Sequence, residues 1–253
     1  MPPISTPSRE NTDTIVEAQS TDSIFKWPSG KKLIVYHTCW STYGRNYQIK
    51  DIPIDYITDI NYAFFNIQKN TQGNYVPMTG DAWADFDQRM VNIDKGLQPL
   101  DSWNEDKPFY GNFGQFKKLI DAGKKFNLGL SIGGWTWSQN FSLAVRTQES
   151  RKAFVDEIIA IFDKFPIFNS VDYDWEYPSK NGKVLGMEHN IAHPDDGKNF
   201  VALLKLTKDR LKATGRSHYQ VTCCVAADPA KLDEFPAEAF QYLDSVNCMT
   251  YDF

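Results

Sequence analysis

Extended apolar runs alternate with amphipathic helical segments along most of this chain, and this alternation limits the possible folds more than any other feature. Strands that alternate with helices predict parallel pairing, with the helices packed outside the sheet. Residues rich in β-branched and aromatic side chains predict six strands, at 31–40, 57–67, 127–135, 168–177, 219–227 and 244–253. Apolar side chains at helical spacing predict helices at 112–126, 149–165 and 195–215, with a further helical link at 230–243.

Two architectures satisfy this pattern, an open doubly wound sheet and a closed (β/α)8 barrel. A doubly wound nucleotide-binding sheet has a glycine-rich turn after its first strand, but residues 41–46 read STYGRN, and neither GxGxxG nor GxxxxGK[ST] occurs in the chain. Polar and aromatic residues instead gather at the carboxyl ends of several strands, where a barrel builds its site. We therefore predict an α/β fold of the (β/α)8 TIM-barrel type.

The domain limits follow from the same pattern. The sequence ends at Phe253, after about six of the eight strands that a closed barrel needs. An open barrel leaves an unpaired parallel edge, so we expect residues 31–253 to be an incomplete barrel from a longer protein or a larger assembly. Residues 1–30, rich in Ser, Thr and Pro, are predicted to be a disordered polar leader. Residues 68–112 are predicted to be an ordered insertion.

Charge and hydropathy argue against several kinds of partner. The 253 residues carry a net charge of -5, and the 27 Lys and Arg residues are scattered, unlike a surface for nucleic acid or an anionic membrane. No stretch approaches about 18 consecutive apolar residues, so no membrane span is predicted. The N-terminus has neither the basic nor the apolar segment of a secretory signal, which leaves the location of the protein unknown.

The four cysteines, Cys39, Cys223, Cys224 and Cys248, all lie in apolar, strand-like runs. They show no CxxC spacing and no Cys/His pattern of a zinc site. We expect buried free thiols rather than a disulfide framework.

The predicted strand at 168–177 contains three carboxylates at alternate positions, Asp172, Asp174 and Glu176. Successive side chains of a strand point to opposite faces, so these three residues, here named the acidic triad, share one face. The opposite face carries apolar and aromatic side chains, which are expected to pack against the helical layer: Val171, Tyr173, Trp175 and Tyr177. The acidic triad should therefore point into the barrel.

Three covered carboxylates in series raise one another's pKa, so at least one should hold a proton near neutral pH, ready to protonate a leaving group. Asp and Glu make up 32 of the 253 residues, so this spacing alone is weak evidence. A solvated acidic stripe and a carboxylate site for Mg²⁺ or Ca²⁺ are the alternative interpretations.

Three segments, in this order along the chain, resemble the signatures of family 18 glycoside hydrolases, the chitinases. LSIGGWTWS at 130–138 is similar to the SxGGW signature, SVDYDWEYP at 170–178 to DxxDxDxE, and MTYDF at 249–253 to a motif of the sixth strand. YGRNY and INYAFF resemble the bacterial chitinase A branch of the family. The likeness runs from about residue 31 to the end, with Asn169 and Ser170 in place of the usual Asp-Gly.

The resemblance implies retaining, substrate-assisted hydrolysis of β-1,4-linked N-acetylglucosamine polymers, without a metal ion or an organic cofactor. Glu176 would protonate the glycosidic oxygen while the 2-acetamido oxygen of the substrate attacks the anomeric carbon. Asp174 would bind the acetamido N–H, and Asp172 would share a proton with Asp174. Tyr251 would donate to the acetamido oxygen, and Asp252 would help to hold the sugar.

Further positions that match the family would line the substrate-binding site. Met249 would form its floor, and Tyr36 and Phe64 would line the pocket of the sugar that is cleaved. Trp135 can offer a flat face to a pyranose ring, and the glycines before it, Gly133 and Gly134, would let the sugar approach the backbone. Each also has a simpler interpretation, as a turn with a core aromatic or as ordinary barrel filling.

The implied partner is chitin or a chitooligosaccharide, which lies outside the cell. An endo-β-N-acetylglucosaminidase that acts on N-glycans would use the same acetamido chemistry. Outside the enzymes, the alternative is a non-catalytic chitin-binding lectin or a structural subunit. The presence of Glu176 favours catalysis, whereas the incomplete barrel favours a non-catalytic role.

Overall fold

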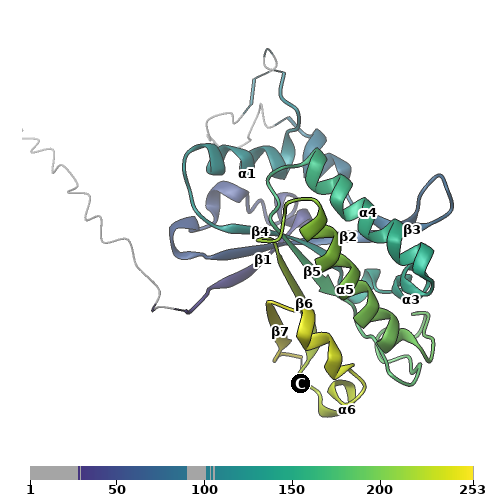
Figure 1. The fold of residues 1–253 in the computed structure, drawn as a ribbon. Helices are drawn as coiled ribbons and strands as arrows, with labels where there is room; N and C mark the ends of the chain where they lie inside the picture. Colours follow the sequence, from purple (N-terminus) through teal and green to yellow (C-terminus); the bar gives the residue numbers. More distant parts are fainter. Residues whose placement is uncertain (1–27, 29, 90–100, 103, 105, 253) are drawn as a thin grey trace, which may run out of the picture.

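The computed structural model describes residues 28, 30–89, 101–102, 104 and 106–252 (Figure 1). The leader predicted for residues 1–30 lies almost entirely outside the described residues, and so does part of the insertion predicted for 68–112. The rest of the chain forms one sheet with helices packed on it.

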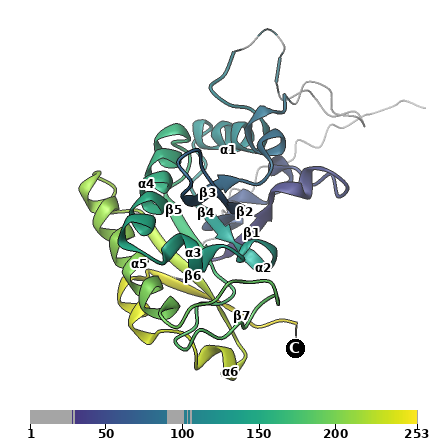
Figure 2. The same ribbon diagram turned by 90° about the vertical axis from the view of Figure 1, so that its right-hand side faces the viewer.

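Six parallel strands form the sheet in the order β1-β2-β4-β5-β6-β7, so neighbouring strands follow one another along the chain. Their bounds are Ile34–Thr38 (β1), Asp59–Lys69 (β2), Asn127–Gly133 (β4), Ser170–Asp174 (β5), Gln220–Ala226 (β6) and Ser245–Met249 (β7). The sheet is curved, with the helices on its outer side, as Figure 2 shows in the view turned by 90°. This is the parallel (β/α) arrangement that the sequence predicts, with six strands of a barrel wall.

Three long helices cover the outer face of the sheet: α1 (Gly111–Asp121), α4 (Gln148–Lys164) and α5 (Asp196–Ala213). In helix α4, the sequence explains both where the helix begins and which face is buried. The Thr147 side chain accepts a hydrogen bond from the backbone N–H of Ser150 and caps the first turn. Phe154, Ile158 and Phe162 then recur at helical spacing and are buried against the sheet. The three helices agree with the predicted segments to within a few residues.

Shorter elements lie in the connections. They comprise α2 (Gly134–Trp137), α3 (Phe141–Val145), α6 (Pro229–Leu232), 3-10 turns at Cys39–Thr42, Ile49–Asp51, Ile54–Tyr56 and Ala237–Tyr242, and a π-helical turn at Trp83–Asp87. The link predicted as helical at 230–243 is thus divided into α6 and a 3-10 turn. Several of these short elements follow the carboxyl end of a strand, where they surround the site.

The insertion after β2 contains a strand that the sequence analysis did not predict. Strand β3 (Tyr75–Thr79) pairs antiparallel with the outer half of β2, from Phe65 to Lys69. The turn between them is closed by the Asn70 side chain, which accepts hydrogen bonds from the backbone N–H groups of Gln72 and Asn74. Pro77 interrupts the strand signal, and proline is tolerated here because β3 is an edge strand.

A buried carboxylate, Asp85, anchors the described part of this insertion to the sheet. It accepts hydrogen bonds from the hydroxyls of Tyr62 on β2 and Thr79 on β3. The Asn112 amide of α1 donates in turn to the Tyr62 hydroxyl, at 2.9 Å. Burial raises the pKa of Asp85 to about 6 despite these hydrogen bonds, which lower it. Polar contacts therefore hold the π-helical turn against both the sheet and helix α1.

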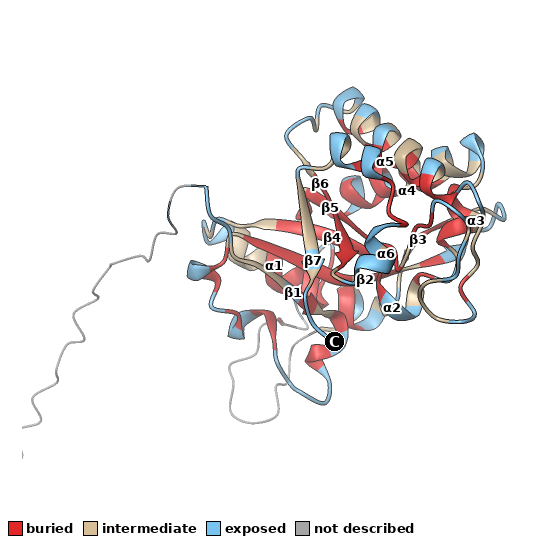
Figure 3. Ribbon diagram, turned by 90° about the horizontal axis from the view of Figure 1, so that it is seen from below, coloured by how far each residue is buried: buried red, intermediate tan, exposed pale blue. Residues whose placement is uncertain are grey.

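The core between the sheet and helices α1 and α4 is strongly aromatic, and Figure 3 shows the buried residues concentrated there. Phe113 of α1 lies at its centre and is fully buried. Its ring lies within 4.9 to 6.3 Å of five other aromatic rings: Tyr62, Phe65, Phe86, Phe165 and Phe168. Edge-to-face and offset contacts of this kind contribute beyond the burial of apolar area.

Replacement of Phe113 by Ala should lower the free energy of unfolding by about 3 to 5 kcal/mol, because it removes a fully buried ring and leaves a cavity. Equilibrium denaturation in guanidinium, followed by tryptophan fluorescence, measures this change. Phe240→Ala is the matched control, since that ring is 49% exposed. A loss at Phe113 no larger than the loss at Phe240 would contradict the central role of this ring.

Candidate active site

The acidic triad lies at the carboxyl end of β5, in the interior of the curved sheet. Asp172 is fully buried, and its two carboxylate oxygens accept hydrogen bonds from four strands. The donors are Tyr36 of β1 (2.9 Å), Ser131 of β4 (2.9 Å), Thr222 of β6 (2.5 Å) and Asn247 of β7 (3.2 Å). Burial raises the pKa of Asp172, and these hydrogen bonds oppose the rise.

Asp174, the last residue of β5, is 4% exposed and has far fewer partners. Burial raises its pKa well above the usual range, and the negative charges of Asp172 and Glu176 raise it further. Its Oδ1 atom has no hydrogen-bond partner among the described residues. Asp174 lines a cavity of about 580 Å³ together with Tyr36, Phe64, Asn247, Met249 and Tyr251. Asp174 is thus the member of the acidic triad that lines this cavity.

Glu176 lies two residues beyond the end of β5, so the strand predicted to reach Tyr177 was too long. Burial raises the pKa of Glu176; a hydrogen bond from Tyr177 and the charge of Lys231 lower it, and the charge of Asp252 raises it. A carboxylic acid that retains its proton toward neutral pH can act as a general acid.

The opposite face of β5 packs outward, as predicted, with one exception. The Tyr173 ring contacts Phe154 and Phe200, and the Trp175 ring is stacked on Phe141 at 5.0 Å. Tyr177 was expected on this face but lies beside Glu176, with the Lys231 ammonium 4.9 Å from the centre of its ring. The alternation ends where the strand ends, which is why the pattern failed at this residue.

The packing of the protein itself requires Gly133 and Gly134. Both have positive φ, 105° and 76°. A Cβ atom at Gly133 would lie 2.4 Å from the backbone oxygen of Asp174, and one at Gly134 would lie 2.9 Å from the ring of Phe64. These glycines let the turn after β4 pack closely on the acidic strand, and the approach of a sugar to their backbone stays a prediction.

Aromatic side chains surround a second pocket of about 300 Å³ beside the acids, lined by Trp40, Phe64, Gly133, Trp135, Thr136 and Trp137. Trp135 and Trp40 are each 48% exposed, so their rings are available to a ligand. Phe64 lines this pocket and the cavity of Asp174, which places the two side by side. Sequence reasoning missed Trp40, whose only signal is its position just after the first strand.

The segment after β7 contributes the remaining predicted residues. Met249 ends β7, and Tyr251 is 62% exposed at the rim of the Asp174 cavity. Burial and the negative charges around it raise the pKa of Tyr251 to about 12, so its hydroxyl remains a donor at neutral pH. Asp252 is exposed, with a φ of 58°.

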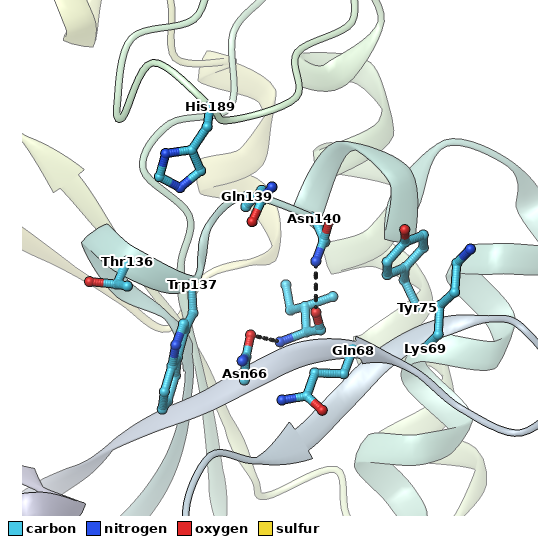
Figure 4. A pocket seen from close by; sticks show the side chains of 10 residues that line it. Asn66, Gln68, Lys69, Tyr75, Thr136, Trp137, Gln139, Asn140 and His189 are labelled. Atoms are coloured by element: carbon cyan, nitrogen blue, oxygen red, sulfur yellow. Dashed lines mark hydrogen bonds between the residues drawn. The ribbon is translucent and has the colours of Figure 1, made fainter.

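A further cavity of about 500 Å³ lies along the outer half of β2, and Figure 4 shows it. Its walls come from β2, β3, α2 and the loop that follows β5, and they include Asn66, Gln68, Trp137, Asn140 and His189. The Asn140 amide donates to the backbone oxygen of Ile67 at 3.0 Å. None of the described residues that line this cavity is a carboxylate, whereas Asp174 lines the cavity at the acidic triad.

Glu234, a buried residue that follows α6, holds the long loop between β5 and α5 through hydrogen bonds. The Glu234 carboxylate accepts hydrogen bonds from Ser179 (3.1 Å), Asn181 (2.9 Å) and Lys183 (2.5 Å). Lys183, followed by Asn181, lowers the pKa of Glu234 to about 2. The loop that begins at Glu176 is thereby held against the connection after β6.

Within the described part of the chain, no group of three or more His, Cys, Asp or Glu side chains is arranged to hold a metal ion. A search of the same residues for a helix able to cross a membrane, by length and apolar character, also finds none.

A family profile supports what the geometry suggests. The profile for glycosyl hydrolases family 18 matches residues 32–253. The chain belongs to the family 18 glycosyl hydrolases.

Individual relatives agree with this assignment. Endochitinase 1 of Metarhizium robertsii is 33% identical over 226 residues, which are 87% of this chain and 47% of the relative. Chitinase A1 of Niallia circulans is 31% identical over 242 residues, 88% of this chain and 34% of the relative. The solved catalytic domain of a psychrophilic chitinase B from Arthrobacter TAD20 superposes with a TM-score of 0.74 at 31% identity, covering 87% of this chain and 59% of that one. The chain spans about half the length, or less, of these curated relatives.

The four thiols should differ sharply in reactivity. All are free, and Cys39, Cys223 and Cys224 are buried, but Cys248 is exposed, which corrects the prediction of four buried thiols. Burial raises the pKa of the Cys39 thiol to about 12 and those of Cys223 and Cys224 well above their usual value. We expect an aromatic disulfide reagent to titrate one thiol rapidly in the native protein and four in denaturant. Cys248→Ser should abolish the rapid phase, and a rapid phase that survives this change would contradict the assignment.

The ion pair between Glu234 and Lys183 predicts a specific pH dependence of stability. Its folded-state pKa lies below its ordinary value of 4.5, so its ionised form stabilises the fold above that pH, and this contribution is lost as pH falls toward about 2. Glu234→Gln should melt below the wild type at pH 7, with a gap that narrows between pH 4.5 and 2. Thermal denaturation across this range tests it, with exposed Glu238→Gln as the control. A gap that stays constant with pH would exclude an ionic origin.

Proposed function

We propose that this chain carries the acid-bearing part of a retaining chitinase, which cuts β-1,4-linked N-acetylglucosamine polymers within the chain by substrate-assisted catalysis. The observation that carries the proposal is the buried acidic triad at the carboxyl end of β5: burial raises the pKa of all three side chains, and Asp174 lines an open cavity. Family membership and relatives that are named chitinases support the same conclusion. The reaction needs no metal ion and no organic cofactor.

Glu176 is the general acid of the proposed reaction. It gives its proton to the glycosidic oxygen as the bond to the anomeric carbon breaks. The 2-acetamido oxygen of the same sugar attacks that carbon and forms a cyclic oxazolinium ion, so no carboxylate nucleophile is required. Glu176, now ionised, takes a proton from the water that opens the ring. Two displacements at one carbon retain its configuration.

The other two carboxylates serve the acetamido group. Asp174 has an oxygen without a partner among the described residues, suited to accept the acetamido N–H and so to orient the attacking oxygen. The negative charge of Asp172 raises the pKa of Asp174. In the proposed reaction, this charge therefore keeps Asp174 protonated or turned toward the substrate. Tyr251 would donate to the acetamido oxygen, which is consistent with its raised pKa and its exposure.

The remaining site residues would hold the sugars. Trp135 has an exposed ring that can stack on a pyranose, and Trp40 of the same pocket is added to the predicted set. Met249, Tyr36 and Phe64 line the cavity at the acids. Asp252 raises the pKa of Glu176 through its charge, which supports a role for Asp252 beside the acid.

Glu176→Gln should reduce the hydrolysis of a fluorogenic chitooligosaccharide by about a hundredfold or more, because it removes the transferable proton. Glu238→Gln, an exposed change of the same kind, should leave the rate unchanged. Proton NMR of the first product should show the β anomer, as retention requires. A Gln variant as active as the wild type, or an α-anomeric product, would overturn the proposal.

Two other functions remain as outcomes of the same assay. A lectin or structural subunit would bind chitooligosaccharides without turnover in the wild type. An endo-β-N-acetylglucosaminidase would release glycans from a glycoprotein and leave chitin intact. The intact Glu176 and its raised pKa favour catalysis over binding alone.

A further inference from the structure

Two buried side chains bind the backbone of Glu176, one at its N–H group and the other at its C=O group. On one side, the backbone N–H of Glu176 donates to the Ser138 hydroxyl oxygen at 2.9 Å. Ser138 is fully buried, and its own proton is directed to the backbone oxygens of Gly134 (2.9 Å) and Asp174 (3.2 Å). A single hydroxyl therefore joins the turn after β4 to the acidic segment after β5.

On the other side, the Asn190 amide donates to the backbone oxygen of Glu176 at 3.0 Å. Asn190 is 9% exposed and lies in the loop between β5 and α5. Its own N–H donates to the backbone oxygen of Met187 (2.9 Å), and the next residue, Ile191, donates to the backbone oxygen of Gln139 (3.2 Å). The two holding residues are thus tied to each other, because Gln139 directly follows Ser138.

The close packing around Asn190 explains a nearby glycine. A Cβ atom at Gly186 would lie 2.1 Å from the backbone oxygen of Glu176 and 2.7 Å from the Asn190 amide nitrogen. Any larger residue at this position would separate the donor from its acceptor. The loop is therefore shaped to bring Asn190 to Glu176.

These contacts replace the support that a sheet would give. Strand β5 ends at Asp174, so no strand pairing fixes the backbone of Glu176. A buried N–H or C=O group without a partner is costly, and the two side chains satisfy one each. A carboxyl group whose backbone is fixed in this way occupies a narrower range of positions.

We propose that Ser138 and Asn190 are positioning residues, which act through the backbone of Glu176 to place its carboxyl group for proton transfer. The inference rests on the proposed function, because it assigns to Glu176 the role of general acid. In this proposal neither residue contacts the substrate. Both fix the position of the Glu176 carboxyl group.

The test compares Ser138→Ala, which removes the acceptor, with Asn190→Ala, which removes the amide donor without adding a charge. Each should lower kcat on a chitooligosaccharide by about tenfold or more, since small displacements of a catalytic group are costly, while KM stays within about twofold. Ser142→Ala is the matched control, because Ser142 is also fully buried but lies on α3, away from Glu176. The control should lose stability and keep its kcat. Ser138→Thr, which restores a hydroxyl, should recover part of the loss.

A second measurement does not need turnover. Side-chain ¹³C NMR can follow the ionisation of Glu176, with Glu176→Gln to assign the signal. In Ser138→Ala and Asn190→Ala, the midpoint should move toward the ordinary value by about half a pH unit or more, because the released carboxyl reaches solvent. It should not move in Ser142→Ala.

The outcomes separate the two proposals. If the wild type hydrolyses the substrate and both variants keep its kcat, the positioning role is overturned and the proposed function stands. If the wild type does not hydrolyse it, the proposed function fails, and the NMR midpoints alone decide: unchanged midpoints in both variants overturn the positioning role. Thermal melts identify a variant that does not fold, in which case the kcat and the midpoint of the other variant decide.

Discussion

The site depends on the cost of burying the Asp172 carboxylate. A carboxylate taken out of water must be compensated by hydrogen bonds, and here the donors come from β1, β4, β6 and β7, while Asp172 itself lies on β5. Each donor reaches the carboxylate only if its strand has the correct register and the sheet is curved. The hydrogen bonds that offset the cost of burying Asp172 therefore also fix the inner surface of the sheet, where Asp174 and Glu176 lie.

Much of the fold could be predicted from periodicity. The alternation of apolar runs and helical stripes located six parallel strands and three long helices, because each pattern has a period that only one kind of element satisfies. Strand β3 was missed since its short run contains Pro77 and gains its stability from pairing with β2, a contact between segments. The end of β5 was misplaced for a related reason: Tyr177 continues the alternation in the sequence, but the backbone pairing stops at Asp174.

The site was partly predictable. The acidic triad could be found from spacing and context, and the structure places Trp135, Met249 and Tyr251 in the pockets around it. The packing role of the two glycines could not be predicted, because their close neighbours, Asp174 and Phe64, come from other strands. Ser138 and Asn190 could not be found at all, since a serine or an asparagine carries no periodic signal and its partner is a backbone group. Cys248 lies in an apolar run, but that run forms β7 at the end of the strand order, where its neighbours are only half-buried and Cys248 is exposed.

The bond between the Asn247 amide and the Tyr36 hydroxyl joins β7 to β1, across 211 residues of sequence. During synthesis, Tyr36 leaves the ribosome long before Asn247, so this bond cannot form until β1 to β6 have all been made. Contacts of such long range close late and slow the search for the native state. Until β7 emerges, the Asp172 carboxylate lacks the donor that Asn247 supplies.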